Sequence, residues 1–338
     1  MTPETAVRQR CRVAAIVTAA LSVSAAACGG GARTVDVDGG APDIAVLGDI
    51  VVAARPGQTV ALRHAGEVVS GAEAPITHAF VGPGDRLPPI FAPQAGGLIP
   101  TPAVWGQCRG GDPATVTGAC PILPADGPQS WDGKAYWSTG AMVPSETREI
   151  PLADGIAEGD HVLTCALHPS LRVLLRIGGD DDDGAKADPE AAVAAARSAL
   201  QDEAVGADVT VTAGVETDGA YVAAFSPQTV RIPLGGSVTW RPGGRTPVDV
   251  VFGAAAEHEG ENPLSLSHTT PIDGRPAGDT GAWDGRGELR SGFLSADPAA
   301  GGAAEKWTVT FARPGTYTYA SRFGDQMIGT VVVAEASR

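Results

Sequence analysis

The chain has 338 residues, and its 39 acidic side chains outnumber its 24 lysines and arginines, which gives a net charge of −15 at pH 7. A surface of this sign repels phosphate backbones and anionic headgroups, so nucleic acid is not expected as a partner, whereas a basic protein is permitted. Hydrophobic residues make up 43% of the chain, with 45 glycines and 27 prolines, which indicates a folded, loop-rich protein of more than one domain.

The N-terminus has the layout of a secretory signal peptide over residues 1–27, with three arginines and then the apolar run VAAIVTAALSVSAAA, too short for a spanning helix. The AAACGGG that follows resembles the lipobox of bacterial lipoproteins, although Ala25 stands where such motifs usually have leucine. This resemblance implies that Cys28 is lipidated and that 28–42 is a flexible tether. A simple cleaved signal with an unmodified cysteine is the alternative. We expect an exported chain on the periplasmic or extracellular face of a bacterial membrane.

Two regions of the chain have β patterning. From 43 to 178, runs such as QTVALRH and LRVLLRI are separated by Gly, Pro and Asp turns, which predicts a sandwich or barrel. GGDDDDGAKAD is typical of a solvated linker, and Asp188 before Pro189 predicts the start of an Ala-rich helix. The strand pattern returns over 207–338. We therefore expect two β domains joined by an acidic linker and a short helix over 179–206.

The two β regions are predicted to be copies of each other. SWDGKAYWSTGAM (130–142) matches AWDGRGELRSGFL (282–294), with the tryptophan, aspartate and glycines in register. Each stretch precedes a strand and a closing segment, so GDHVLTCALHPSLRVLLRI stands opposite GTYTYASRFGDQMIGTVVV. The region between 81 and 150 is a long insertion, which we expect to cover the sandwich or to shape a docking face.

The five cysteines divide by position. Cys11 leaves with the signal peptide, and Cys28 is assigned to lipid. Cys108 and Cys120 bracket a Gly-rich loop and, in an exported protein, are most simply a disulfide. Cys165 is left without a partner. An exported thiol is exposed to oxidation unless it is buried or bound to a metal.

Both closing segments resemble the last two strands and connecting loop of cupredoxins, the blue-copper proteins. In that family a pattern of the type G-x-Y-x-Y-x-C-x-x-H-P-x-M-x-G closes the sandwich, and an earlier histidine completes the site. The resemblance covers both β regions. It implies an all-β chain of two tandem Greek-key cupredoxin-like β-sandwiches, with copper as the cofactor in one mononuclear site.

The resemblance also implies the copper ligands. The first region keeps Cys165 and His168 of the motif and has Leu171 where the family has methionine, while APITHAFVG supplies His78 as the earlier histidine. His64, in ALRHAG, is the competitor for that position. Two imidazoles and one thiolate suit both oxidation states of copper. Because leucine cannot ligate copper, we expect a higher reduction potential than in a relative with methionine.

The second region lacks the strong ligands. It has Ser321 in place of the cysteine and Gly324 in place of the histidine, although it keeps Met327 and Gly329, and its TPVDVVFG contains no histidine. His161 stands four residues before Cys165, about 13 Å along a strand, too far for the same metal. The remaining histidines, which we expect to be solvated, are His258 and His268.

The leading hypothesis is a membrane-anchored mononuclear blue-copper electron-transfer protein with a protein redox partner, in which electrons enter at His168 in an exposed loop. Copper oxidases and nitrite reductases need further copper bound by His-x-His pairs, and the chain has no such pair, so we do not expect an enzyme. The alternative is a metal-free or copper-holding cupredoxin-like scaffold at the cell surface. The oligomeric state is not predicted.

Overall fold

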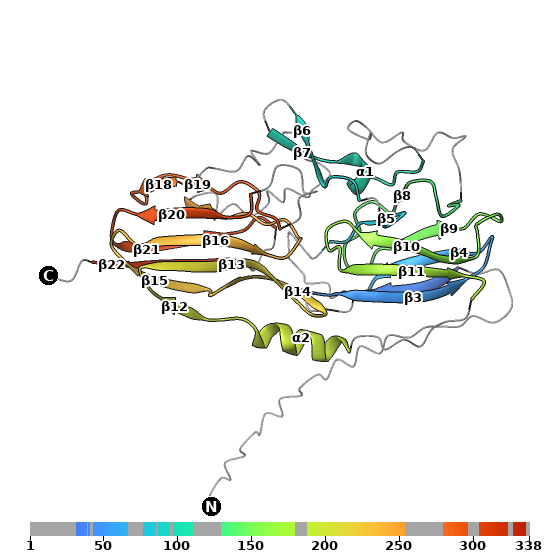
Figure 1. Cartoon of the computed structure of the whole chain (residues 1–338), viewed down its shortest axis with the longest axis horizontal. Helices are drawn as coiled ribbons and strands as arrows, with labels where there is room; N and C mark the ends of the chain where they lie inside the picture. The colour runs from blue at the N-terminus through green and yellow to red at the C-terminus, as the bar shows by residue number, and fades with distance from the viewer. Residues whose placement is uncertain are drawn as a thin grey trace, which may run out of the picture.

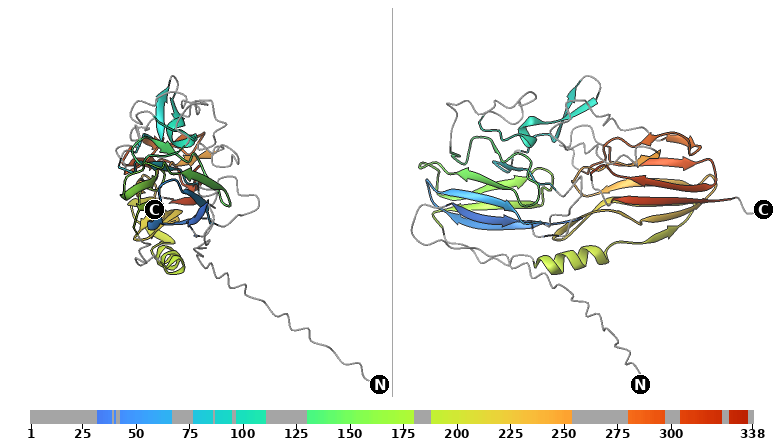
Figure 2. Two further views of the ribbon diagram at one scale, coloured as in Figure 1. Left: turned by 90° about the vertical axis from the view of Figure 1, so that its right-hand side faces the viewer. Right: turned by 180° about the vertical axis from the view of Figure 1, so that it is seen from behind.

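The computed structural model describes residues 32–38, 40, 43–66, 77–85, 87–94, 97–110, 130–179, 188–253, 280–296, 304–323 and 327–335. Two β halves lie along the long axis of the molecule (Figure 1). Helix α2 lies on one side of the molecule, next to β14 near the junction of the halves, and the β6–β7 hairpin and α1 project on the opposite side (Figures 1 and 2). The all-β fold class predicted from the sequence is confirmed.

The first half is built largely from short strands, and its elements are β1 (Arg33–Val37), β2 (Ile44–Val46), β3 (Gly48–Ala54), β4 (Thr59–His64), β5 (Phe80–Gly82), β6 (Phe91–Gln94), β7 (Gly97–Pro100), α1 (Pro102–Trp105), β8 (Trp137–Ser138), β9 (Thr147–Pro151), β10 (Gly159–Cys165) and β11 (Leu171–Ile177). The second half and the helix before it contain α2 (Pro189–Ser198), β12 (Glu203–Val205), β13 (Asp208–Thr217), β14 (Ala220–Ser226), β15 (Thr229–Pro233), β16 (Ser237–Gly243), β17 (Val251–Phe252), β18 (Thr280–Trp283), β19 (Leu289–Arg290), β20 (Trp307–Phe311), β21 (Gly315–Ala320) and β22 (Ile328–Ala334).

Each half is a sandwich of two sheets with the same strand order. The order β3-β11-β10-β5-β8 in the first half matches β15-β22-β21-β17-β19 in the second, and β1-β4-β9 matches β13-β16-β20. The parallel and antiparallel pairings also agree, since β11 is parallel to β3 and antiparallel to β10, as β22 is to β15 and β21. The internal repeat seen in the sequence is therefore a repeat of topology.

Strand β11 illustrates why these sequences form a sandwich. Its residues LRVLLRI alternate, so that the first, third, fifth and seventh side chains are buried in the core. The intervening Arg172 and Arg176 point outward and form ion pairs with Asp49 and Asp160 on the neighbouring strands. The alternation fixes which face of the strand packs inward, and through it the register of the sheet.

The two halves share a strand pairing and a core. β2, from the first half, pairs antiparallel with β14 of the second, with Tyr221 opposite Ala45. Tyr221 and Phe293 of the second half belong to the hydrophobic core of the first. Phe293 also stacks on Phe91 of the insertion, with ring centroids 4.4 Å apart. The inserted region thus packs against the second half as well as the first.

Helix α2 begins as predicted. Asp188 is the N-cap, its carboxylate accepts hydrogen bonds from two backbone amides of the first turn, and Pro189 follows it. The helix ends at Ser198, before the end of the predicted 179–206 segment. Near the end of that segment, Glu203–Val205 forms β12, which pairs with β15. Buried alanines of α2 pack against β2 and β14, so the helix covers the strand pairing that joins the two halves.

One predicted boundary is wrong. Residues 33–37 were expected to lie in the flexible tether, but they form β1, which pairs in parallel with β4. Val37 is fully buried, and Arg63 on β4 forms a two-point ion pair with Asp36, so this segment is held by burial and charge. The predicted signal peptide and Cys28 lie outside the described residues. Within the part of the chain that the structure describes, no helix has the length and apolar character to cross a membrane.

Candidate metal centre

Three predicted ligands meet inside the first half. His78 lies between β4 and β5, where its backbone makes two hydrogen bonds with Met142. Cys165 ends β10 and pairs with Phe80, and His168 lies in the turn between β10 and β11. The exposed fractions are 0% for His78 and Cys165 and 5% for His168, so the three side chains form a group shielded from bulk water.

The spacing of these side chains fits one metal ion. The sulfur of Cys165 lies 3.5 Å from Nδ1 of His78 and 3.7 Å from Nδ1 of His168. Metal–nitrogen bonds of about 2.0 Å and a metal–sulfur bond of about 2.3 Å, at an angle of roughly 110–120°, separate nitrogen and sulfur by about 3.5–3.7 Å. A set of two imidazoles and one thiolate is the donor set of blue-copper centres. The residues present therefore fit the implied metal.

The electrostatics of the group favour a bound cation. Burial alone would raise the pKa of the Cys165 thiol, but contacts with His168 and His78 hold that pKa well below its usual value. Burial would likewise lower the pKa of His78, but Asp38 and Cys165 outweigh it and raise the pKa. The buried group thus holds two negative charges, on Cys165 and Asp38, on opposite sides of the His78 imidazole, and a metal cation bound at Cys165 would offset this charge.

Asp38 and His64 lie behind His78, on the side away from Cys165. Oδ2 of Asp38 is 3.0 Å from Nε2 of His78, and both side chains are essentially inaccessible to solvent. The ring of His64 lies 4.5 Å from that of His78, and its Nδ1 accepts a hydrogen bond from the amide of Gly66. His78 is therefore the histidine that faces Cys165, while its predicted competitor His64 lies in an outer layer. Asp38 had not been predicted, because VDVDGG reads as part of a tether.

Leu171 is buried and begins β11, and its amide donates to the carbonyl of His168 at 2.8 Å. Its hydrocarbon side chain offers no ligand atom. His161 is separate from the ligand group: its Nε2 lies 2.8 Å from the carbonyl of Ala157, and its ring packs on Trp131. Its predicted exclusion from the site agrees with this position.

The predicted cysteines differ in how the structure places them. Cys165 is free and buried, as expected of a thiol without a disulfide partner. Cys108 is also buried, but Cys120 lies outside the described residues, so the proposed disulfide stays a prediction. His258 and His268 lie outside the described residues as well.

The expected exposure of His168 is wrong, because the second half covers it. The ring of Tyr221 in β14 lies against the His168 ring, with centroids 5.2 Å apart. The Thr246 hydroxyl donates to the carbonyl of Leu167 at 3.0 Å. This hydrogen bond connects the turn between β10 and β11, called the ligand turn below, to the second half. Burial, followed by the charge of Glu216, raises the pKa of Tyr221, so the covering phenol remains neutral.

The corresponding site in the second half has a different chemistry. Val248 takes the place of His78, since its backbone is bridged to Leu294 as that of His78 is bridged to Met142. Ser321 follows β21 where Cys165 ends β10, as the sequence comparison predicted.

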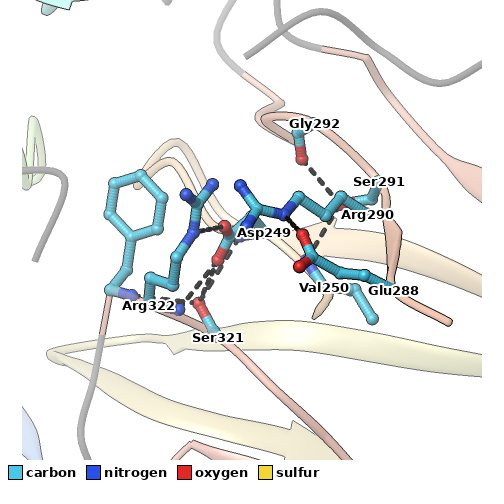
Figure 3. A network of polar contacts seen from close by, with 9 residues as sticks. Asp249, Val250, Glu288, Arg290, Ser291, Gly292, Ser321 and Arg322 are labelled. Atoms are coloured by element: carbon cyan, nitrogen blue, oxygen red, sulfur yellow. Dashed lines mark hydrogen bonds and ion pairs between the residues drawn. The ribbon is translucent and has the colours of Figure 1, made fainter. Parts of the chain in front are cut away.

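An ion pair occupies this second site. The carboxylate of Asp249 accepts from the Ser321 hydroxyl at 3.1 Å and from the backbone amide and Nε of Arg322 at 2.9 and 2.6 Å (Figure 3). The side chains of Asp249 and Arg322 are 1% and 7% exposed. Figure 3 shows a second ion pair nearby, between Glu288 and Arg290. Charge pairing thus holds the closing loop of the second half to the segment just before strand β17.

No protein-family model matches the sequence, and no curated protein does. Solved structures that resemble the chain include a purple cupredoxin from Nitrosopumilus maritimus, at 16% identity over 38% of this chain and 100% of that one, with a TM-score of 0.22. Plastocyanin from Dryopteris crassirhizoma is 22% identical over 37% of this chain and 99% of its own, with a TM-score of 0.23. A copper-containing nitrite reductase from Thermus scotoductus is 17% identical over 85% of this chain and 60% of its own, with a TM-score of 0.24. The solved structures that resemble the chain thus include cupredoxins and copper enzymes.

Proposed function

We propose that the chain is an exported, membrane-anchored copper protein whose first half holds one mononuclear blue-copper centre that carries single electrons. His78, Cys165 and His168 would hold the metal, which supplies the one-electron redox chemistry when bound. The observation that carries this proposal is the spacing of one cysteine sulfur from two Nδ1 atoms, 3.5 and 3.7 Å, in a group of three buried side chains. No residue is assigned an acid–base role.

The fold fixes the positions of the candidate ligands and excludes water from them. Cys165 ends β10, which pairs with β5, and His78 stands two residues before β5 with its backbone hydrogen-bonded to Met142. The sheet therefore sets the separation between the two side chains. Leu167 and Leu171, which stand on either side of His168 in the sequence, are buried, and the ring of Tyr221 covers that of His168. A rigid, water-excluding site limits rearrangement between the two oxidation states of copper, which favours electron transfer over ligand exchange.

A second candidate is a copper-holding protein that does not cycle electrons. The observation that favours it is the cover over His168, since a partner protein cannot contact that ring directly while Tyr221 lies on it. The two candidates differ in the behaviour of the bound ion. A carrier is reduced and reoxidised many times without loss of copper, whereas a holding protein releases copper on one of the two steps.

The test is the visible absorption spectrum of the full mature chain on addition of Cu²⁺. We expect an intense thiolate-to-copper band, as the resemblance to blue-copper proteins implies, that saturates at one copper per chain and disappears in Cys165→Ser. Ser321→Ala, at the equivalent position of the second half, is the matched control and should keep the band. A wild-type chain that takes up no stoichiometric copper, or a band that survives Cys165→Ser, would contradict the proposal.

A further inference from the structure

Asp38 is the buried acidic residue in contact with a candidate ligand. Building on the proposed copper site, we propose that Asp38 is a positioning residue: its carboxylate orients His78 toward the metal and, through its negative charge, stabilises the divalent over the monovalent ion. Asp38 follows β1, and its Oδ2 lies 3.0 Å from Nε2 of His78.

The carboxylate itself is held in place. Its Oδ1 accepts hydrogen bonds from the amides of Gly40 at 2.8 Å and Val46 at 2.9 Å, which leaves Oδ2 for His78. A side chain at Gly40 would collide with the carbonyl oxygen of Ile44, at 1.8 Å, so only glycine permits this turn. The turn therefore presents one oxygen of Asp38 to the imidazole in a fixed direction.

This arrangement determines which nitrogen of His78 can bind a metal. An ionised carboxylate only accepts hydrogen bonds, so Nε2 of His78 must carry the proton that it donates to Asp38. Nδ1, which faces Cys165 at 3.5 Å, then has its lone pair free for a metal. Hydrogen bonds of this kind from an outer carboxylate to a metal-binding histidine fix the ring and increase its basicity.

The second half provides an internal comparison. β13 corresponds to β1, and Gly214 in β13 has a positive φ of 66°, close to the 56° of Asp38. Glycine adopts this conformation without strain, whereas aspartate does so less readily. The half without histidine and cysteine at the ligand positions has glycine there, and the half with these ligands has an aspartate at a strained position. This contrast favours a role tied to the metal.

A second metal ion between Asp38, His64 and His78 would be another use of the same residues, since their polar atoms also lie within 4.8 Å of one another. The hydrogen bonds oppose it. Nδ1 of His64 already accepts from the Gly66 amide, and Nε2 of His78 is at hydrogen-bond distance from Asp38. An ion bound between the three side chains would have to displace the contact between His78 and Asp38, so we infer that the carboxylate acts on His78 directly.

The experiment uses the full mature chain and two substitutions at Asp38. Asp38→Asn keeps the shape and tolerates positive φ but places an amide where the acceptor stood. Asp38→Gly copies the residue of the second half. Asp36→Asn, two residues earlier on β1, removes the same charge from a side chain paired with Arg63 and is the matched control. Thermal unfolding of the metal-free variants verifies that each one folds.

Calorimetric titration with Co²⁺ measures the affinity, and redox titration of the copper-loaded protein measures the potential. We expect both Asp38 variants to bind Co²⁺ about 10–100-fold more weakly than the wild type. We also expect their potentials to rise, by about 59 mV for each tenfold loss of Cu²⁺ affinity relative to Cu⁺. Changes no larger than those of Asp36→Asn would overturn the role of Asp38.

The Co²⁺ titration separates this inference from the proposed function. A wild-type chain that binds one Co²⁺ in a Cys165-dependent manner but gives no blue band with Cu²⁺ contradicts the blue-copper function, while the Asp38 variants still report on His78. A second Co²⁺ that binds only when His64 is present would overturn the direct role of Asp38. A wild-type chain that binds neither ion overturns both proposals.

Discussion

Tyr221 of the second half lies on the ring of His168 in the first, with centroids 5.2 Å apart, and so closes the end of the candidate metal site. Its exposed fraction is 3%, and it packs in the core of the first half rather than of its own. The half without ligands is thus part of the wall around the site. The second half therefore has a structural role at the candidate site, although its own corresponding positions carry no histidine or cysteine.

Replacing Tyr221 by leucine should open the site. We expect an external chelator to remove copper about tenfold faster than from the wild type. Loss of the ring contact would lower the activation free energy of copper release by about 1.4 kcal/mol, which corresponds to a tenfold change in rate. Tyr221→Phe retains the ring against His168 and should release copper at the wild-type rate. Equal rates for all three proteins would show that the second half does not protect the metal.

The contact between Thr246 and Leu167 should contribute measurably to stability. Thr246→Val leaves the buried carbonyl of Leu167 without this donor, which we expect to cost about 1–3 kcal/mol in the free energy of unfolding. Urea denaturation of the metal-free chain measures the loss. Thr246→Ser keeps the hydroxyl and should lose less than Thr246→Val. If serine and valine destabilise the chain equally, the hydrogen bond is not the cause.

The Asp249–Arg322 ion pair should be essential to the second half. Asp249→Asn leaves a buried guanidinium uncompensated, and we expect a loss of about 3–5 kcal/mol in the free energy of unfolding. The double substitution Asp249→Leu with Arg322→Met removes both charges and should recover much of this loss. The control Asp284→Asn, whose side chain is 51% exposed, should change stability far less. A single substitution as mild as the control would contradict the role given to the ion pair.

Leu171→Met should lower the reduction potential of the copper-loaded protein. A thioether at the axial position stabilises Cu²⁺, and a tenfold gain in its relative affinity corresponds to a shift on the order of 60 mV. Leu175→Met, on the same buried face of β11, is the control and should leave the potential near that of the wild type. An unchanged potential in Leu171→Met would show that this residue does not lie at the axial position.

The sequence was sufficient to predict the all-β class, the repeat and the three candidate ligands, because each depends on local patterning or on a short motif. It was not sufficient for Asp38, whose contact with His78 spans 40 residues. Asp38 also stands in VDVDGG, next to glycines that are typical of a flexible tether. Nor could it predict the cover over His168, which depends on the pairing of β2 with β14 over three residue pairs.

These two omissions change how the protein should be studied. The segment 43–178, which the sequence suggests as a separate domain, lacks Asp38 and the whole of β1. It also lacks Tyr221 and Thr246, which cover the ligand turn. Experiments on copper binding therefore need both halves of the chain together with β1.

The most direct test of the copper assignment is a crystal structure of the copper-loaded full chain with anomalous diffraction data at the copper edge. We expect one strong anomalous peak, within bonding distance of Nδ1 of His78, Sγ of Cys165 and Nδ1 of His168, with no peak beside Ser321. A peak between Asp38 and His64, or no ordered copper at Cys165, would contradict it.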